Sequence, residues 1–361
     1  MTATTTLPAL DERHPLQPFW TLAAAPVQAE ALALALESGV LDGLAEPRTA
    51  AEVAATQGWH AGNTALWLEL LWGMGVVQQQ GAATTAPRYV LTPMAQRYLH
   101  GSSPQACGGA WLFRLRSLRH AATLLRDQVA HGPAGQGSLA PFAKGNAEGW
   151  AAAARAQIGQ EQRAVTVPAA LAVLQRVPEL TGARSMLDLG GGPGEVALAL
   201  AHQRPLLYAT VFDWPEAEAV AADNAAQAGL AARVHTRGGD LAQQGPQGDI
   251  GAGYDLVWCS SVLHFVPDAA AAIRKVFGAL APGGVFVCAH AEVADAPEDA
   301  LGVLPYYLPM RLLGRHVTRQ GVLEALLAEA GFERMERIVS HAFPLAPLAV
   351  LVARKPAGGA A

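Results

Sequence analysis

Apolar side chains at the spacing of a helix mark the N-terminal part of the chain. They run from Phe19 to Leu44, with Pro26 placed to start or kink a helix and Gly39 placed to end one. Thr49 and Glu52 then have the spacing of a capping box, in which each side chain satisfies a backbone N–H of the first turn. The pattern predicts one or two packed helices, followed by a short helix after Thr49.

A helix, a turn and a hairpin follow. The run TALWLELLWGMGVV (64–77) predicts a helix, QQQGAATTAPRYVLT (78–92) a hairpin and MAQRYL (94–99) a last helix. This order is typical of a winged helix, a fold that many repressors use to read DNA. The helix that would read DNA carries Trp67 and Trp72 but no Lys or Arg to contact phosphates. We therefore expect a dimerisation module and no nucleic-acid partner.

The pattern changes at Ser185, where apolar strand-like runs begin to alternate with Ala-rich helices. The runs are SMLDLG, LYATVFD, YDLVWCS and GGVFVCAH, and helical segments follow the first three. Such alternation is the signature of an α/β fold, in which helices cover both faces of a parallel sheet. The chain is thus expected to hold a mostly helical winged-helix domain over 1–105, a helical region over 106–180 and a Rossmann-like domain over 181–361.

Composition points to an oligomer that acts on small molecules. Hydrophobic residues make up 51% of the chain and charged residues 15%, so a partner is expected to cover part of the surface, and we predict a homodimer. A net charge of -5 provides no basic surface for nucleic acid. Cys107, Cys259 and Cys288 are scattered, which favours free thiols in a reducing compartment, the last two as small core residues. Without a signal sequence or a long uninterrupted apolar run, the protein is expected to be cytoplasmic, with no membrane partner.

The most informative segment is MLDLGGGPGEVALAL (186–200), where a strand runs through Asp188 into a glycine loop and then a helix. Glycines there let the backbone turn tightly and approach a ligand, which predicts a nucleotide-type cofactor pocket. Asp213, after the next strand, can bind both hydroxyls of a ribose. NAD would satisfy these features too, yet Asp188 beside the loop would repel a pyrophosphate and suits a cationic cofactor better.

Several motifs in a fixed order carry a family resemblance. The chain reads DLGGGPG, TVFDWP, GGDL, YDLVWCSSVLHFVPD and LAPGGVFV, with LLAEAGF near its end. In kind and order these resemble the plant-type and polyketide-tailoring small-molecule O-methyltransferases, such as the caffeate, acetylserotonin and anthracycline enzymes. The resemblance implies a homodimeric enzyme that uses S-adenosyl-L-methionine (SAM) and releases S-adenosyl-L-homocysteine (SAH). It places the methionine part of SAM at the glycine loop, the ribose at Asp213 and the adenine at Asp240 and Leu241. The implied SAM-contacting residues are Asp188, Gly190, Gly191, Gly192, Gly194, Asp213, Trp214, Asp240, Leu241 and Ser260.

The same resemblance implies that His264 removes the proton from an acceptor hydroxyl. An imidazole suits this role because its reference pKa of about 6.5 lets it accept a proton near neutrality. Where the family usually carries two glutamates that assist the base, this chain has His290 and His316. Glu292, on the same side of its strand as His290, would take the first place if the alignment shifts by two residues.

Three imidazoles without a carboxylate leave three alternatives open. His264, His290 and His316 form a polar lining around one active base, they hold a divalent metal, or they serve an acceptor that needs little deprotonation. A thiol, with a reference pKa near 8.5, would be such an acceptor, and the reaction would then be S-methylation. We adopt the first alternative, with no metal ligand.

Apolar and aromatic residues are expected to bind the acceptor, because LPYYLPM (304–310) occupies the place of the family's substrate lid. The candidates are Trp150, Phe265, Tyr306, Tyr307 and Met310, with Trp111 as a further one. The sequence thus predicts SAM-dependent methyl transfer to a hydroxyl or thiol of a small apolar acceptor. Its rivals are a SAM-binding relative that does not methylate and a winged-helix regulator.

Overall fold

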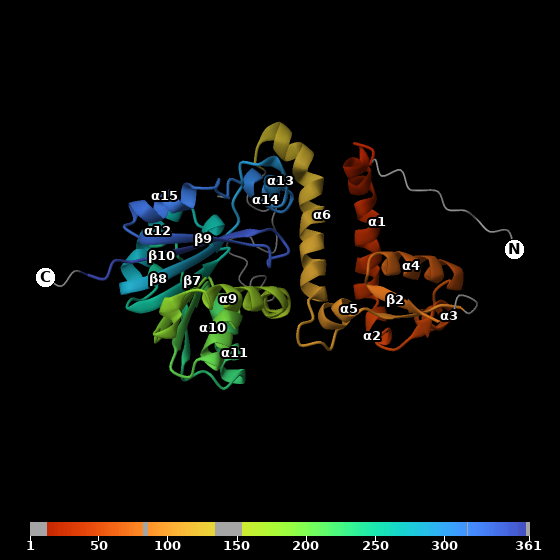
Figure 1. The fold of residues 1–361 in the computed structure, drawn as a ribbon, viewed down its shortest axis with the longest axis horizontal. Coiled ribbons are helices and arrows are strands. Elements are labelled where there is room, and N and C mark those ends of the chain that lie inside the picture. Colours follow the sequence, from red (N-terminus) through yellow and green to blue (C-terminus); the bar gives the residue numbers. More distant parts are fainter. Residues whose placement is uncertain (1–12, 82–85, 134–153, 316, 359–361) are drawn as a thin grey trace. The chain divides into compact units, whose positions relative to one another are not determined.

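The computed structural model describes residues 13–81, 86–133, 154–315 and 317–358. The chain divides into two compact units, 1–108 and 109–361, and each is described by itself. Figure 1 labels the elements of both units.

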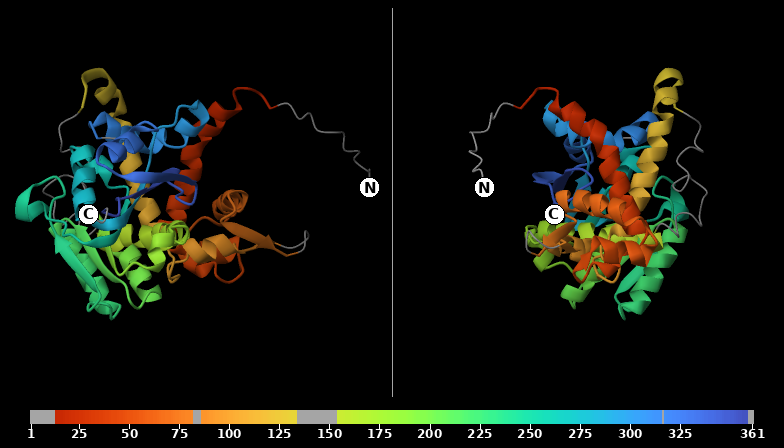
Figure 2. Two further views of the ribbon diagram at one scale, coloured as in Figure 1. Left: turned by 60° about the vertical axis from the view of Figure 1, so that its left-hand side comes forward. Right: turned by 90° about the vertical axis from the view of Figure 1, so that its right-hand side faces the viewer.

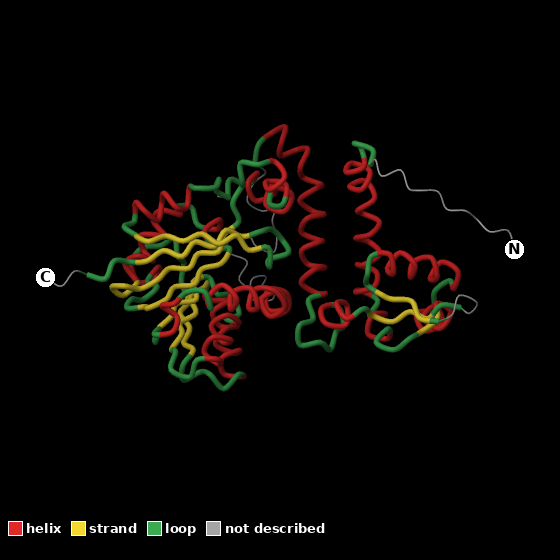
Figure 3. The backbone as a smooth tube through the Cα atoms, in the orientation of Figure 1, coloured by secondary structure: helices red, strands yellow, loops and turns green. Residues whose placement is uncertain are grey.

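The first unit is mostly helical and holds one small sheet (Figure 3). Its strands lie in the order β1-β3-β2 with antiparallel neighbours, so the predicted hairpin is confirmed. The elements are α1 (Gln17–Glu37), α2 (Val40–Gly43), β1 (Arg48–Thr49), α3 (Ala50–Gln57), α4 (Ala61–Gly73), β2 (Val77–Gln80), β3 (Arg88–Leu91) and α5 (Pro93–Tyr98).

Local hydrogen bonds explain where these helices begin and end. The capping box is present: the Thr49 N–H donates to Glu52 Oε2 at 2.7 Å, and the Glu52 N–H donates to Thr49 Oγ1 at 3.2 Å. The helix predicted over 64–77 instead spans Ala61–Gly73. It ends early because Gly75 takes a φ of +73°, after which the chain enters β2.

Helix α1 leaves most of its apolar surface exposed. It buries Ala31, Ala33 and Ala35. Its exposed large apolar side chains are Phe19, Trp20, Leu22, Val27 and Leu34. By length and composition alone, α1 is also the one helix among the described residues that could cross a membrane, and 17% of its apolar window is buried. Gln28 and Glu30 interrupt the apolar side chains of α1, so this finding does not contradict the expectation of no long uninterrupted apolar run. The exposed apolar surface favours a partner that covers this helix.

The second unit is built on a seven-stranded sheet in the order β6-β5-β4-β7-β8-β10-β9 (Figures 1 and 2). The four predicted strands are confirmed as β4, β5, β7 and β8, which pair in parallel. The strands are β4 (Ser185–Leu189), β5 (Tyr208–Asp213), β6 (Val234–Gly238), β7 (Tyr254–Ser260), β8 (Leu280–His290), β9 (Glu333–Ser340) and β10 (Leu348–Arg354).

The prediction of a wholly parallel sheet was wrong, because β10 runs antiparallel to both β8 and β9. Neither β6, β9 nor β10 was predicted as a strand. β9 reads ERMERIVS and lies at the edge with mostly exposed side chains, so it lacks an apolar run. β10 reads LAVLVAR and is buried throughout, but the pattern of a buried strand does not encode its direction.

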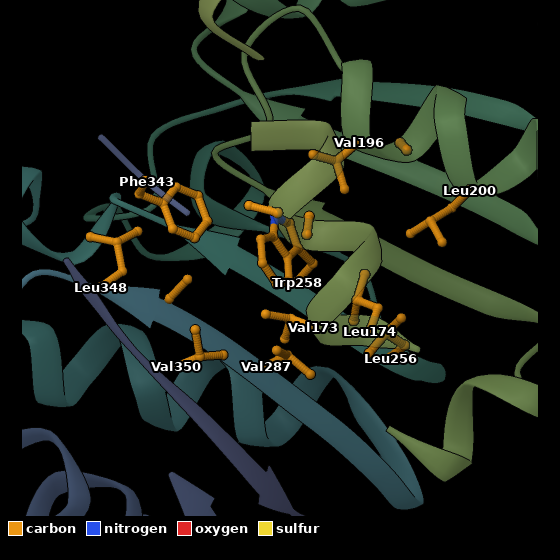
Figure 4. Close-up of a cluster of buried hydrophobic side chains, with 14 of the residues drawn as sticks. Val173, Leu174, Val196, Leu200, Leu256, Trp258, Val287, Phe343, Leu348 and Val350 are labelled. Carbon is orange, nitrogen blue, oxygen red and sulfur yellow. The ribbon is translucent and has the colours of Figure 1, made fainter. Parts of the chain in front are cut away.

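Helices cover both faces of this sheet, as predicted. On one face, Trp258 of β7 packs among residues of β8, β10, α9 and α10, including Val287, Val350, Val173 and Val196 (Figure 4). On the other face, α12 and α15 cover a second buried cluster, which contains the free thiols of Cys259 and Cys288. These cysteines are register partners on β7 and β8, so their predicted core position is confirmed.

The remaining elements connect or flank the sheet. They are α6 (Gly108–His131), the π-helical turns η2 (Ala154–Ile158) and η3 (Gln162–Thr166), α8 (Gly159–Glu161), α9 (Val167–Leu174), η4 (Pro178–Thr181), α10 (Glu195–Gln203), α11 (Pro215–Gln227), η5 (Gly245–Gly248), η6 (Leu263–Phe265), α12 (Ala269–Ala279), α13 (Pro297–Leu301), α14 (Leu304–Leu312) and α15 (Val322–Glu329). The helices of the predicted 106–180 region that are described from residue 109 onward belong to the same unit as the sheet.

Candidate active site

A cavity lies at the carboxyl ends of β4, β5 and β7, the edge where open α/β sheets bind ligands. Most of the residues predicted for the site line it. They are Asp188, Gly190, Gly191, Gly192, Asp213, Trp214, Ser260, His264, Phe265, Tyr306, Tyr307 and Met310.

The glycine loop after β4 follows a path that only glycine adopts without strain. Gly190, Gly192 and Gly194 have φ values of +68°, +57° and +78°. A Cβ at Gly190 would lie 2.3 Å from Cγ2 of Val262, so the loop passes directly against the segment that follows β7. The backbone therefore sits at the cavity wall with no side chain between it and a ligand.

Asp213 ties the end of β5 to this loop. Its Oδ2 accepts from the Gly192 N–H at 2.7 Å, and its Oδ1 accepts from the Trp214 N–H at 2.7 Å. Burial raises the pKa of Asp213 to about 6, although both hydrogen bonds act to lower it. Each carboxylate oxygen can accept a further hydrogen bond, which suits a pair of ligand hydroxyls.

Asp188 places a second carboxyl group under the loop. It is buried, and its Oδ2 accepts from the Ala197 N–H at 3.2 Å. Burial, with a smaller contribution from the nearby charge of Asp213, raises the pKa of Asp188 to about 7, although the hydrogen bond from Ala197 acts to lower it. A cationic ligand in the cavity would favour the ionised form of both carboxyl groups.

Three predicted SAM contacts do not line the cavity. Gly194 is the N-cap of α10. Asp240 bonds within its own loop, where its Oδ1 accepts from the Ala242 N–H at 3.0 Å, and Leu241 is buried in the core under α12. The adenine role of Asp240 and Leu241 therefore stays a prediction.

His264 is a buried imidazole on the cavity wall, in the short helix η6. Its ring centroid lies 5.4 Å from that of His290, at the end of β8, and 5.5 Å from that of Tyr307. Burial, His290, Arg315 and Arg114 together hold the pKa of His264 well below its ordinary value. Of the three histidines predicted to share one lining, His264 and His290 lie side by side, but only His264 lines the cavity.

Other predicted residues either lie away from the cavity or fall outside the described residues. Glu292 is buried and pairs with Arg337 at 2.5 Å, and neither Glu292 nor His290 lines the cavity. His316 and Trp150 fall outside the described residues, and Trp111 does not line the cavity. Among the residues that the structure describes, no three His, Cys, Asp or Glu side chains form a group that could hold a metal ion.

The remaining wall is aromatic and apolar. Tyr306 and Tyr307 of α14 stand edge to face with ring centroids 5.3 Å apart, and Phe265 lies 4.2 Å from His264 by the same measure. Met310 of α14 completes this surface. Such a wall suits a planar apolar molecule.

The helices before β4 supply cavity residues that the sequence did not reveal. Ala154, Ile158, Gln162 and Thr166 recur every fourth residue along η2, α8 and η3, and all line the cavity. The Gln162 amide holds the glycine loop, since its Nε2 donates to the Gly191 carbonyl at 3.0 Å. Arg114 and Glu161 also line the cavity. For residues 154–166 the nearest signal in the sequence is their position in helical segments shortly before the glycine loop. That position does not show which face of the helix is turned towards the cavity.

Two family models match the chain. A model described as a methyltransferase domain matches residues 187–286, and one described as an O-methyltransferase dimerisation domain matches residues 20–101. The first contains the glycine loop, Asp213 and His264, and the second lies within the first unit, which spans 1–108.

The names of curated relatives specify methyl transfer to different acceptor atoms, namely nitrogen, carbon and oxygen. The N,N-dimethyltransferase OxyT of Streptomyces rimosus is 29% identical over 67% of this chain and 68% of its own length. The L-tyrosine C(3)-methyltransferase of Streptomyces lavendulae is 28% identical over 46% of each chain. The acetylserotonin O-methyltransferase of Mus musculus is 27% identical over 80% of this chain and 76% of its own.

Solved structures share the fold over nearly the whole chain. An O-methyltransferase family protein from Burkholderia thailandensis has a TM-score of 0.74 at 18% identity and covers 96% of this chain and 100% of its own. Human N-acetylserotonin methyltransferase in complex with SAM has a TM-score of 0.70 at 22% identity, with coverage of 96% and 99%.

The close approach of Gly190 to Val262 can be tested against a matched glycine. Gly229 has the same φ of +68°, but a Cβ added there would have nothing within 4 Å. Gly229→Ala is expected to lower the free energy of unfolding by about 1–2 kcal/mol through backbone strain alone. Gly190→Ala is expected to cost about 2–5 kcal/mol, because the clash adds to the strain. Urea unfolding measures both, and equal losses would show that Val262 moves aside freely.

Proposed function

Because the chain belongs to the SAM-dependent methyltransferases that carry an O-methyltransferase dimerisation domain, we propose that it methylates a hydroxyl of a small planar acceptor. One observation carries this proposal: His264 stands between the glycine loop and the aromatic wall of a single cavity. The loop side suits the cofactor, and the aromatic side suits the acceptor.

The residues around the loop fit SAM. Positive φ glycines leave the backbone open to the methionine part, Asp213 retains acceptor capacity for the ribose hydroxyls, and Asp188 offers negative charge near a cationic ligand. Trp214 and Ser260 line the same part of the cavity. When bound, SAM supplies a reactive methyl group on a sulfonium, so the protein's contribution is chiefly to position the acceptor.

His264 would take the acceptor proton at Nε2. Its Nδ1 is enclosed and has no hydrogen-bond partner among the described residues, which leaves Nε2 as the nitrogen that can reach a ligand. No described carboxylate holds a proton on Nδ1, and the surrounding cations lower the pKa further. His264 is therefore a weak base, and it suits a hydroxyl that is already acidic.

The same weak basicity supports a second candidate, transfer to a thiol. A thiol ionises near pH 8.5, so it needs less help from a base than an ordinary phenol, whose pKa is about 10. His264 would then only orient the acceptor. A metal-assisted reaction through His264, His290 and His316 is a further hypothesis, which a chelator tests directly.

We expect SAM to bind more weakly in acid. A bound cation favours the ionised carboxylates, whose pKa values in the free protein are about 7 for Asp188 and about 6 for Asp213. Binding then requires both carboxyl groups to lose their protons, so the Kd for SAM should rise by up to roughly 60-fold from pH 7 to pH 5.5. Over this range the amino group of SAM stays protonated. Calorimetry measures the Kd. Asp188→Asn should bind SAM more weakly at pH 7 and lose most of the pH dependence, whereas tight NAD binding without SAM binding would contradict the proposal.

His264→Ala should lower kcat by about 100-fold to 10,000-fold with a hydroxyl acceptor and leave SAM affinity unchanged. His202→Ala, on the exposed face of α10, is the matched control and should change neither. The assay is SAH formation with a panel of phenols and thiols. Because the pKa of His264 lies well below 6.5, protonation of this residue should not slow the wild-type enzyme between pH 8 and pH 6.5.

Other outcomes separate the alternatives. A thiol acceptor predicts a modest loss in His264→Ala that shrinks as the pH rises, because the thiol then ionises unaided. A metal site predicts that a chelator abolishes activity. Full activity of His264→Ala on a hydroxyl acceptor at neutral pH would remove His264 from the mechanism.

We also propose that a second copy of the chain covers α1. The exposed apolar side chains of this helix fall within the segment matched by the dimerisation model, apart from Phe19 beside its start. Phe19 and Trp20 are each 69% exposed, a degree of exposure that large aromatic side chains rarely keep in a monomer. The competing occupant is a lipid bilayer, since α1 has the length and composition for one.

Light scattering at micromolar concentration should therefore find a dimer. Trp20→Ser combined with Leu22→Ser should shift the protein towards monomer, because these residues lose apolar area that the partner would bury. Leu206→Ser, at an exposed apolar position of the second unit, is the control and should leave the dimer intact. A wild-type monomer that sediments with lipid vesicles would overturn the proposal in favour of a membrane.

A further inference from the structure

A partly buried ion pair lies on the cavity wall beyond the two tyrosines. Arg114 of α6 and Glu161 at the end of α8 both line the cavity, and Arg114 Nε donates to Glu161 Oε2 at 2.9 Å. Their side chains are 25% and 17% exposed. In the mechanism proposed above, Arg114 acts only as a nearby charge that lowers the pKa of His264, and Glu161 has no role.

A continuous aromatic surface connects the pair to His264. Tyr307 stands edge-on to His264 with centroids 5.5 Å apart, and Tyr306 stands edge-on to Tyr307 at 5.3 Å. The Arg114 Cζ then lies 5.9 Å from the Tyr306 ring centroid. A planar molecule lying along this surface would meet the imidazole near one end and the guanidinium near the other.

The guanidinium of Arg114 has donors to spare. It carries five N–H groups, and the bond to Glu161 uses the one on Nε. None of the described residues accepts a hydrogen bond from its Nη1 or Nη2, although both belong to a largely enclosed side chain. Donors of a charged group that line a cavity gain from a ligand that supplies acceptors.

Charge decides which acceptor fits. Glu161 already neutralises Arg114, so a ligand carboxylate would add an uncompensated negative charge beside a partly buried ion pair and would lie close to Glu161. A neutral carbonyl oxygen accepts the same hydrogen bonds without adding charge. A carbonyl conjugated with the methylated hydroxyl also makes that hydroxyl more acidic, which matches the weak base at the other end.

We infer that Arg114 selects acceptors that carry a neutral carbonyl oxygen, such as a ketone, quinone or amide, at the end of the molecule away from His264. This inference rests on the proposed function for the identity of the site, but it concerns recognition and can be tested by binding alone.

Three naphthols that share one ring system and hydroxyl provide the test. They carry an acetyl, an isopropenyl or a carboxylate group at the far end of the ring, so the first two have the same shape and differ only in the carbonyl oxygen. Calorimetry measures the Kd of each for the SAH-saturated enzyme. Wild type should bind the acetyl compound about tenfold to a hundredfold more tightly than the isopropenyl compound, the range expected for hydrogen bonds to a charged group, and no less tightly than the carboxylate.

Variants of the pair sharpen the result. Arg114→Met should reduce the affinity for the acetyl compound to that of the isopropenyl compound, whose own affinity should stay unchanged. Glu161→Gln leaves Arg114 unneutralised, so the carboxylate compound should gain about tenfold in affinity. Arg126→Met, at an exposed position of the same helix, is the control and should behave like wild type. Circular dichroism confirms that each variant is folded.

Each contrary result has a defined meaning. Equal wild-type affinities for the acetyl and isopropenyl compounds, an equal loss for all three in Arg114→Met, or no binding of any naphthol would overturn the inference. SAH formation is scored separately with SAM-loaded wild type. If the affinity order holds but no compound is methylated, the proposed function fails and the recognition by Arg114 stands. If a compound is methylated but the affinity order does not hold, the proposed function stands and the recognition by Arg114 fails.

Discussion

The backbone between β4 and α10 passes so close to its neighbours that side chains have no room. Gly190 lies against Val262, Gly191 lies against Asp188, and the Gly192 N–H is held by Asp213. These three contacts join β4, β5 and the segment after β7 at one point. Because His264 follows Val262 by two residues, the packing of the loop also sets where the imidazole stands. The packing of the glycine loop thus positions both the cofactor side and the acceptor side of the cavity.

Sequence patterns predicted those elements whose residue types and burial both indicate the same local structure. The four strands with continuous apolar runs, the capping box of Thr49 and Glu52 and the glycine loop could be read from residue types and spacing. The places of His264 and His290 followed from the family resemblance, and the two rings do lie side by side. Each depends on neighbours in the chain or on the rule that parallel strands end at the same edge.

The sequence could not reveal features that depend on how distant segments pack. Edge strands β6 and β9 are polar, so they carry no apolar signal, and the direction of β10 depends on its connection to β9. Arg114 and Glu161 come from helices whose inward faces were unknown, and nothing in the pattern pairs them. Likewise, no local pattern shows that Glu292 turns to Arg337 and away from His290.

The π-helical turns before β4 make the length of that segment matter more than its composition. The segments η2 and η3 are π-helical and therefore wider than an α-helix. Along them, the side chains at every fourth position from Ala154 to Thr166 stay on the cavity side. Removing a single residue from this stretch would rotate everything beyond it by about 100° around the helix axis. Gln162 would then leave the glycine loop and Glu161 would leave Arg114. Evolution can exchange side chains along this wall one at a time, but an insertion or deletion here would dismantle both halves of the cavity in one step.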